Sequence, residues 1–578
     1  MRDRLLTEHF LRRFVENDLL SPEADSHSAL AMVCGGLLTL GLFLSVLISL
    51  KFLFMPFQSP ARTAALAVDD RVLFITLSMI VMALVAVTTW DALSLDPRDT
   101  AILGPLPIER GVIVLAKLRA VAVLAVGFSL ALSSLSSVFH PTLMVAKLTI
   151  GVVPALALIA VHLLVTLAAG LFGFAAVVVI REVLRAALGA RFARVSALLQ
   201  SALIVALVAG LLLLPAVLSR AARTESRLVP PLWFAGLQEQ LAGKLVMSMT
   251  PQRLPRLVAR QEEGAAVRYR ETAARLRPLA WRAPAGLALM IAVAVAAYFW
   301  NSRELPLPLV GQRRRRHPPR RLLARAATLT FARAPATRAG FFFALHCLFL
   351  SPPHRVAMAC CTAVSLAVAT VMLASAGGPL PRDVRTMAIH IFSTQTIALA
   401  VLLAGFRHAT RLPADVRANR YVRTAWVADG ARFAAGVRHA GLLTVVLPVV
   451  ILLLPAHVYL MGTTAALMHG LTGALLGAAA ITLLISRAPH LPLVAGYAPA
   501  QDLPSAGPVM LIGGMFVLSI FSRMEREALA DLRSAAVLWT VLALVAVVPN
   551  LAGRRRPQFA GSSAFDVPAP GTTRLDLG

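Results

Sequence analysis

Long apolar runs recur through this 578-residue chain, and they constrain its fold more than any other feature. A bilayer core of about 30 Å is crossed by roughly 20 apolar residues in a helix. Twelve runs approach that length, at about 29–50, 72–89, 120–139, 148–180, 197–218, 284–300, 356–376, 387–406, 440–460, 464–485, 507–522 and 535–551. The fourth run is long and the eleventh is short, so the pattern is compatible with eleven to thirteen spans. We therefore predict an all-α polytopic membrane protein with about twelve transmembrane helices.

The composition supports the same class of protein. Hydrophobic residues make up 58% of the chain and charged residues 15%, against about 45–50% and 25% in soluble domains. The formal net charge of +28 would suggest nucleic-acid binding in a soluble protein. Here the basic residues form short clusters between apolar runs, where they orient helices and contact anionic headgroups. The sequence therefore predicts membrane lipids, and no nucleic acid, as partners.

The distribution of basic residues predicts an orientation. They gather in the short segments after the second, fourth and sixth runs, as at Arg181, Arg185 and 313–316. Because short cytoplasmic loops are enriched in Lys and Arg, we expect both termini to face the cytoplasm of a bacterial inner membrane. The segment 219–282 would lie outside despite its many arginines, since long loops cross largely regardless of charge. The charged N-terminal residues 1–20 predict no cleaved signal peptide.

The runs divide into two similar halves. Each half opens with a charged amphipathic stretch, gives two spans, then a charged inside loop, then four further spans. The predicted organisation is a first six-span half at 1–300, a basic cytoplasmic linker at 301–324, a second six-span half at 325–551 and a disordered cytoplasmic tail at 552–578.

An interfacial helix is predicted before the first span of each half. Leu6, Phe10 and Phe14 share one helical face near the N-terminus, and 331–350 is the counterpart in the second half. The alternative is that these stretches are ordinary charged flanks of a first span.

Motifs for catalysis or nucleotide binding are missing from the sequence. No GxxxxGK[ST], HExxH or GxSxG string occurs, and Lys244 follows Gly243 without the earlier glycine of a phosphate-binding loop. The four cysteines lack the paired spacing of a zinc site or a disulfide framework, and they are Cys34, Cys347, Cys360 and Cys361. We therefore predict that the chain is not an enzyme and carries no cofactor and no metal.

The twelve apolar runs contain no Asp, Glu or Arg, but four histidines, His162, His390, His457 and His469. A neutral histidine bonded to a neighbouring helix is the favoured interpretation, and a ligand or proton relay is the alternative. A coupled secondary carrier would need more buried charge, so the pattern favours an energy source outside the chain.

The segment after the second run carries the most specific signal. Pro105 and Pro107 bracket Leu106 and prevent 101–103 and 108–118 from forming one straight helix. This spacing predicts a short amphipathic elbow in the cytosol, and the alternative is a tight turn without a partner.

The string DPRDTAILGPLPIERGVIVLAK around this elbow resembles the cytoplasmic loop of permease subunits of type-two ATP-binding-cassette exporters. In that family an acidic stretch is followed by a leucine, an LP pair and a basic residue, and a lysine opens the third span. The interfacial helix and the six-span unit are similar too. The second half keeps Leu412 and Pro413 in RLPADVRANRYVRTAWV but lacks the later LP pair.

The resemblance implies the permease component of an ATP-driven export system, which forms the translocation path while a separate ATP-binding-cassette subunit hydrolyses ATP. The implied docking residues are Asp96, Asp99, Pro105, Leu106, Pro107, Glu109, Arg110 and Lys117. A second candidate docking loop contains Pro413, Asp415, Arg417 and Arg438. The alternatives are a polytopic scaffold or assembly factor that does not transport, and a twelve-span secondary carrier.

Overall fold

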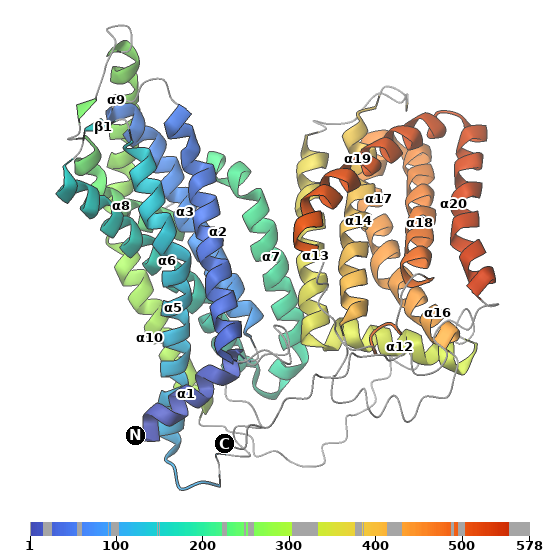
Figure 1. Cartoon of the computed structure of the whole chain (residues 1–578), viewed down its shortest axis with the longest axis horizontal. Helices are drawn as coiled ribbons and strands as arrows, with labels where there is room; N and C mark the ends of the chain where they lie inside the picture. The colour runs from blue at the N-terminus through green and yellow to red at the C-terminus, as the bar shows by residue number, and fades with distance from the viewer. Residues whose placement is uncertain are drawn as a thin grey trace. The chain divides into compact units, whose positions relative to one another are not determined.

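The computed structural model is helical at nearly all of the residues that it describes (Figure 1). It describes residues 2–15, 26–54, 60–90, 92–93, 103, 105–146, 148–149, 151–221, 228–247, 250–251, 259–302, 333–375, 384, 387–412, 430–486, 491–494 and 503–553. The chain forms two compact units. Unit 1 comprises Met1–Leu203 and Gly210–Gln312, and unit 2 comprises Ile204–Ala209 and Arg313–Gly578.

Unit 1 is built from long helices with a smaller helical cap at one end. Its helices are α1 (Arg2–Val15), α2 (Ser26–Phe54), α3 (Pro60–Thr88), α5 (Arg110–Met144), α6 (Val152–Leu188), most of α7 (Phe192–Ala221), α8 (Pro230–Met247), α9 (Ala259–Leu276) and α10 (Arg282–Ser302), with 3-10 turns η1 (Gly189–Arg191) and η3 (Arg277–Leu279). Two short strands, β1 (Leu148–Thr149) and β2 (Thr250–Pro251), pair antiparallel with Leu148 opposite Pro251. In Figure 1, α1 lies at one end of the unit, and α8 and α9 lie at the other.

Unit 2 repeats the beginning of this order. Its helices are α12 (Pro335–Leu350), α13 (Pro352–Ala374), α14 (Ile389–Arg411), α16 (Gly430–Gly441), a π-helical turn η5 (Leu442–Val446), α17 (Leu447–Met461), α18 (Thr463–Ser486), α19 (Leu503–Leu529) and α20 (Leu532–Gly553). A short helix thus precedes the first long helix in each unit, as α1 precedes α2 and α12 precedes α13, although α12 is largely apolar where α1 is charged.

Ten helices among the described residues are long and apolar enough to cross a membrane. They hold most of the first ten of the twelve apolar runs, and their number and apolar character indicate a multi-pass membrane protein. The last two runs lie in α19 and α20. The apolar part of α20, Leu532–Val548, is shorter than a full crossing, and α19 ends in the charged residues Arg523, Glu525, Arg526 and Glu527. Twelve spans are thus not confirmed.

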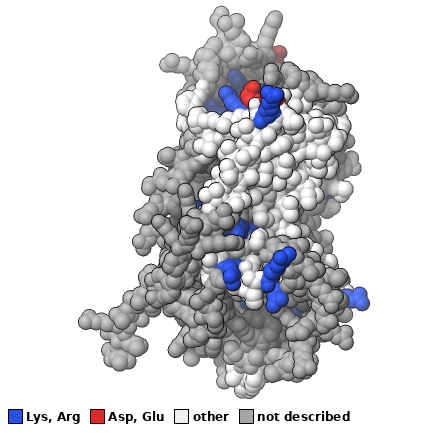
Figure 2. Space-filling view, turned by 90° about the vertical axis from the view of Figure 1, so that its right-hand side faces the viewer, with Lys and Arg blue, Asp and Glu red and all other residues white. Residues whose placement is uncertain are grey.

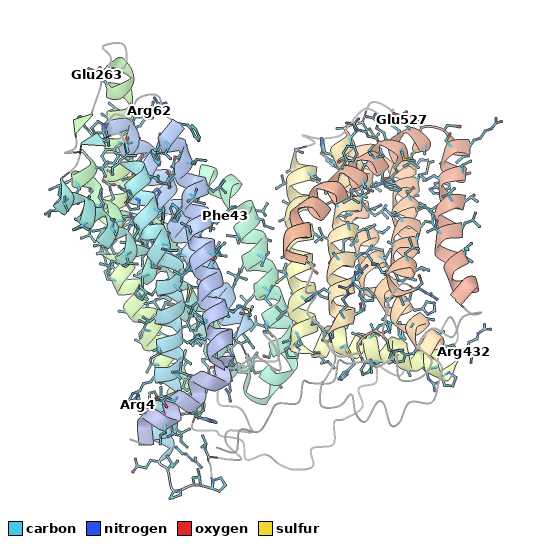
Figure 3. All side chains as sticks on the ribbon, viewed as in Figure 1. Arg4, Phe43, Arg62, Glu263, Arg432 and Glu527 are labelled. Atoms are coloured by element: carbon cyan, nitrogen blue, oxygen red, sulfur yellow. The ribbon has the colours of Figure 1, made fainter. Side chains whose placement is uncertain are left out.

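The outer surfaces of the helices are apolar, as expected for contact with lipid. Phe43 on α2, Leu198 on α7 and Leu452 on α17 are 61%, 73% and 77% exposed, and Figure 3 labels Phe43 beside α2. Figure 2 shows Lys, Arg, Asp and Glu gathered at two levels of the face it presents, with an uncharged band between them. Exposed apolar surface of this extent would cause aggregation in water, whereas in a bilayer it contacts lipid.

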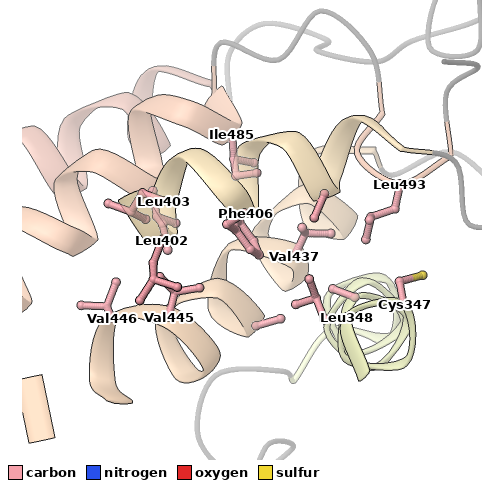
Figure 4. Close-up of a cluster of buried hydrophobic side chains, with 14 of the residues drawn as sticks. Cys347, Leu348, Leu402, Leu403, Phe406, Val437, Val445, Val446, Ile485 and Leu493 are labelled. Atoms are coloured by element: carbon pink, nitrogen blue, oxygen red, sulfur yellow. The ribbon is translucent and has the colours of Figure 1, made fainter. Parts of the chain in front are cut away.

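The short first helix of each unit packs on the helix that follows the charged loop, α1 on α5 and α12 on α16. In unit 2, Gly340 of α12 and Gly436 of α16 bring the two backbones together, because a Cβ on either glycine would lie 2.1 Å from a backbone oxygen of the other helix. A buried cluster surrounds this crossing, and it includes Phe406, Val437, Cys347 and Leu348 (Figure 4). The crossing therefore depends on glycine at both positions.

Candidate functional site: the elbow and two buried polar clusters

The elbow lies between α3 and α5 and exposes its two prolines and the leucine between them. Leu106 is 46% exposed, and Pro105 and Pro107 are exposed on either side of it. The Leu106 amide donates to the Leu103 carbonyl (3.2 Å) and the Ile108 amide to the Leu106 carbonyl (2.7 Å). The chain therefore makes a tight turn and presents one apolar side chain at its tip.

The downstream piece of the elbow is continuous with the third long helix. Helix α5 begins at Arg110, after Glu109 in an extended conformation, and runs unbroken to Met144. Glu109 and Arg110 are both exposed beside the turn. Asp96 and Asp99 lie outside the described residues.

The root of the elbow is firmly packed. Trp90 at the end of α3 is fully buried, and its indole Nε1 donates to Ser196 Oγ of α7 at 2.9 Å. The Arg181 guanidinium of α6 lies 5.6 Å from the Trp90 ring centroid, and Leu93 and Leu103 are buried. The exposed Leu106 therefore follows a segment that is held in place by the buried side chains of Trp90, Leu93 and Leu103.

Lys117, a predicted docking residue, is buried and faces α1. Its side chain is among the largest fully buried ones, and its Nζ lies 4.8 Å from the centroid of the Phe10 ring. Phe10 is itself fully buried. Lys117 thus joins the interfacial helix α1 to α5 and is not part of the exposed surface of the elbow.

In the second half, one of the four candidate docking residues lies in the described part of the chain. Arg438 is half-buried in α16, whereas Pro413, Asp415 and Arg417 lie outside the described residues. Helix α14 ends at Arg411, and the Thr410 carbonyl just before that end accepts a hydrogen bond from the Leu493 amide at 2.7 Å.

The helices contain buried charges that the apolar runs do not reveal. Arg181 and Glu182 of α6 form a buried ion pair, and Asn301 of α10 donates to Glu182 Oε2 at 2.7 Å. Near the cap, Arg71 of α3 pairs with Glu239 of α8 at 3.1 Å. Arg71, Arg181 and Glu182 lie just beyond the ends of runs, inside longer helices, whereas Glu239 lies in the cap helix α8. The expectation that the core lacks charge is therefore wrong, and it no longer counts against a secondary carrier.

The cap is fastened to the bundle through Glu239. Its side chain is 1% exposed and accepts from Arg71, from Arg277 at 3.4 Å and from the Tyr269 hydroxyl. A Cβ at Gly243 would overlap the Glu239 carboxylate, so glycine there makes room for the cluster. The apolar residues Leu237, Leu241 and Leu245 recur at helical spacing along α8.

A pair of histidines is buried against a phenylalanine in unit 1. The rings of His140 on α5 and His162 on α6 have centroids 5.2 Å apart. Phe74 of α3 meets His162 edge-on at 5.4 Å, and Gln238 of α8 bonds His162 Nδ1 at 2.9 Å. The other end of the pair bonds Ser49, whose Oγ lies 2.8 Å from His140 Nδ1.

Unit 2 contains a matching pair. His457 of α17 and His469 of α18 have ring centroids 4.7 Å apart, and Phe392 of α14 meets His469 edge-on at 5.4 Å. Here the partner of the second histidine is acidic, because Glu525 Oε1 of α19 lies 2.6 Å from His469 Nδ1. The repeated Phe–His–His arrangement was not recognised in the sequence, although both second histidines are followed eight positions later by a glycine, Gly170 or Gly477.

A small cavity lies beside Phe74 within unit 1. Its lining includes Phe74 together with Ser78, Ser133, Ser136 and Thr166. Ser133 Oγ is buried and has no hydrogen-bond partner among the described residues. The cavity is large enough for a water molecule, which needs such polar partners.

Comparisons with protein-family models, curated proteins and solved structures find no match to this chain. Within the described ranges, no three His, Cys, Asp or Glu side chains are grouped as a metal ion would require. The candidate sites are therefore defined by their own geometry.

Proposed function

We propose that the chain is the permease component of an ATP-driven export system in a bacterial inner membrane. A separate ATP-binding-cassette subunit docks on the elbow of the first half, and both termini face the cytoplasm. The observation that carries the proposal is the exposed Leu106 between two prolines, after a segment held in place by buried side chains. It agrees with the resemblance of the surrounding string to the docking loops of such permeases.

The geometry suits protein binding because the elbow needs little ordering. Proline restricts the backbone on both sides of Leu106, and the packing of Trp90 holds the root. A preorganised loop loses less conformational entropy on association than a flexible one. Glu109 and Arg110 add charges of both signs beside the apolar tip, which can set the orientation of a partner.

A secondary carrier is the second candidate, and the buried charges favour it. Ion-coupled carriers use ionisable groups buried among their helices, and the His469–Glu525 pair is such a group. The two functions differ in their energy source. Transport by a carrier follows an ion gradient, whereas transport by the proposed permease stops without its ATPase.

Co-purification of the full-length chain from its native membranes tests the docking proposal. We expect a protein with a phosphate-binding loop, together with vanadate-sensitive ATP hydrolysis, to accompany the wild type. Leu106→Asp should remove most of this partner, because a carboxylate buried without a counter-charge is costly. Simultaneous reversal at Glu109 and Arg110 should weaken binding less.

The matched control is Leu228→Asp, which alters another exposed leucine of unit 1, just before α8. It should leave the partner bound. If Leu106→Asp and the double reversal both retain the partner and its ATP hydrolysis at wild-type level, the elbow is only a turn and the permease proposal fails.

A further inference from the structure

Two buried histidine pairs occupy matching places in the two units but differ in one partner. In unit 1 the second histidine, His162, bonds the neutral amide of Gln238. In unit 2 the second histidine, His469, bonds the carboxylate of Glu525. The aromatic neighbour is the same in both, since Phe74 and Phe392 each lie edge-on at 5.4 Å. The difference between the sites is therefore mainly a difference of charge.

We propose that His469 and Glu525 form a proton-binding site in the second half, in which His469 is held as an imidazolium beside the Glu525 carboxylate. The side chains of His469 and Glu525 are 0% and 1% exposed. A carboxylate buried beside a neutral imidazole leaves one net negative charge in an apolar interior, which is costly. One added proton on the imidazole makes the pair neutral overall and gives the carboxylate a charge-assisted hydrogen bond.

Among the described residues, no Lys or Arg forms an ion pair with Glu525. Arg526, the next residue of α19, directs its guanidinium to the Met387 carbonyl (3.5 Å) and to Glu527 (3.2 Å). Helix α14 presents Phe392 and Gln395, neither of which titrates, and Gln395 donates to the His469 carbonyl at 2.9 Å. The proton is thus the ligand that neutralises Glu525.

The groups that titrate around α18 are few near the ring and more numerous at the helix ends. His457 of α17 and Glu525 of α19 contact His469. The others on the packed elements are His390, Arg407, His408 and Arg411 of α14, Arg432, Arg438 and His439 of α16, Tyr459 of α17, Arg523, Arg526 and Glu527 of α19, Asp531, and Arg533 of α20.

The site also contains polar atoms that could serve a bound proton or water. His469 Nε2, His457 Nε2 and Gln395 Oε1 are buried without hydrogen-bond partners among the described residues. Because Glu525 comes from α19 and His469 from α18, the proton also links these two helices, and its release would weaken their contact.

In unit 1 the second histidine bonds an amide in place of a carboxylate. An imidazolium at His162 would face the Gln238 amide, and the nearby Arg71 is already positive. His162 is therefore neutral in the same protein, which makes it an internal reference for His469.

Solid-state NMR of the full-length protein in lipid, labelled with ¹⁵N-histidine and ¹³C-glutamate, tests the proposal at pH 8. An exposed histidine with an ordinary pKa near 6.5 is about 3% protonated there. We expect one imidazolium whose nitrogen is close to a glutamate carboxyl carbon. It should vanish in His469→Gln and in Glu525→Gln, and persist in Glu527→Gln, which alters an exposed neighbour on the same helix.

The wild-type spectrum is decisive even where a variant fails to fold, because it needs no substitution. No imidazolium next to a glutamate carboxyl at pH 8 would overturn the proposal, as would a signal that survives in both His469→Gln and Glu525→Gln. A signal lost in both variants and kept in Glu527→Gln would establish it. The outcome does not depend on whether an ATPase docks on the elbow.

Discussion

The Lys117 ammonium lies 4.8 Å from the centroid of the Phe10 ring, and this contact joins the interfacial helix α1 to the first turns of α5. Both side chains are buried. A desolvated cation over an aromatic face is favourable by about 2 kcal/mol or more. The elbow precedes α5 directly, so α1 and the elbow meet on the same helix end.

Phe10→Ala should release α1 from α5. We expect a loss of about 3 kcal/mol in stability, because the substitution removes a fully buried ring as well as the cation contact. Thermal unfolding in detergent measures the loss, and modification of Lys117 by an amine reagent should increase. Leu5→Ala, which truncates an exposed side chain of the same helix, is the control. Equal effects from both substitutions would contradict the role of Phe10.

Glu239→Gln should loosen the cap. The substitution leaves Arg71 buried with its charge uncompensated, and breaking a buried pair in this way costs roughly 3–5 kcal/mol. We expect a lower unfolding midpoint and faster proteolysis of α8 in the purified protein. Glu8→Gln, in an exposed pair with Arg4, should have almost no effect. A Glu239→Gln protein as stable as the wild type would show that the cap is held by apolar packing alone.

The proposed orientation predicts opposite labelling at the two ends of unit 1. In a variant without the four native cysteines, a membrane-impermeant thiol reagent added from outside should modify a cysteine at position 240 on α8. Residue 240 is exposed, unlike its buried neighbour Glu239. A cysteine at position 302, at the end of α10, should react only after the membrane is permeabilised. The reverse pattern would invert the topology and place the elbow outside.

Gln238→Glu should convert the first histidine site into a copy of the second. The new carboxylate would face His162 Nδ1 as Glu525 faces His469, and we expect a second buried imidazolium in the NMR spectrum at pH 8. Gln238→Met should add no buried imidazolium, because methionine has no carboxylate that could accept a hydrogen bond from the protonated ring. An unchanged spectrum in Gln238→Glu would mean that Arg71 already balances a carboxylate placed there.

The loop of the second half should contribute less to docking than the elbow. It keeps Leu412 and Pro413 but lacks the second proline that restricts the elbow on both sides. Reversing the charges at Asp415 and Arg417 should therefore reduce co-purification of the ATPase less than reversal at Glu109 and Arg110. A larger effect from Asp415 and Arg417 would make the second loop the main contact.

Much of the helical architecture is predictable from the sequence because hydrophobic length decides it. Each of the twelve apolar runs lies largely in a helix, and the stretches before the two halves form α1 and α12. The proline pair also predicts the break before α5, since proline excludes a continuous helix locally. These features depend on residues close together in the chain.

The sequence by itself determined that this chain is a helical membrane protein with an elbow between two prolines. Only the tertiary structure decided that the Lys117 ammonium contacts the Phe10 ring, that Glu239 pairs with Arg71 and that His469 pairs with Glu525. The effects of hydropathy and of proline depend on residues within one or two helical turns, so they can be predicted from the local sequence. Partners 56 to 168 residues apart are brought together only when whole helices pack, and burial then makes their charges consequential.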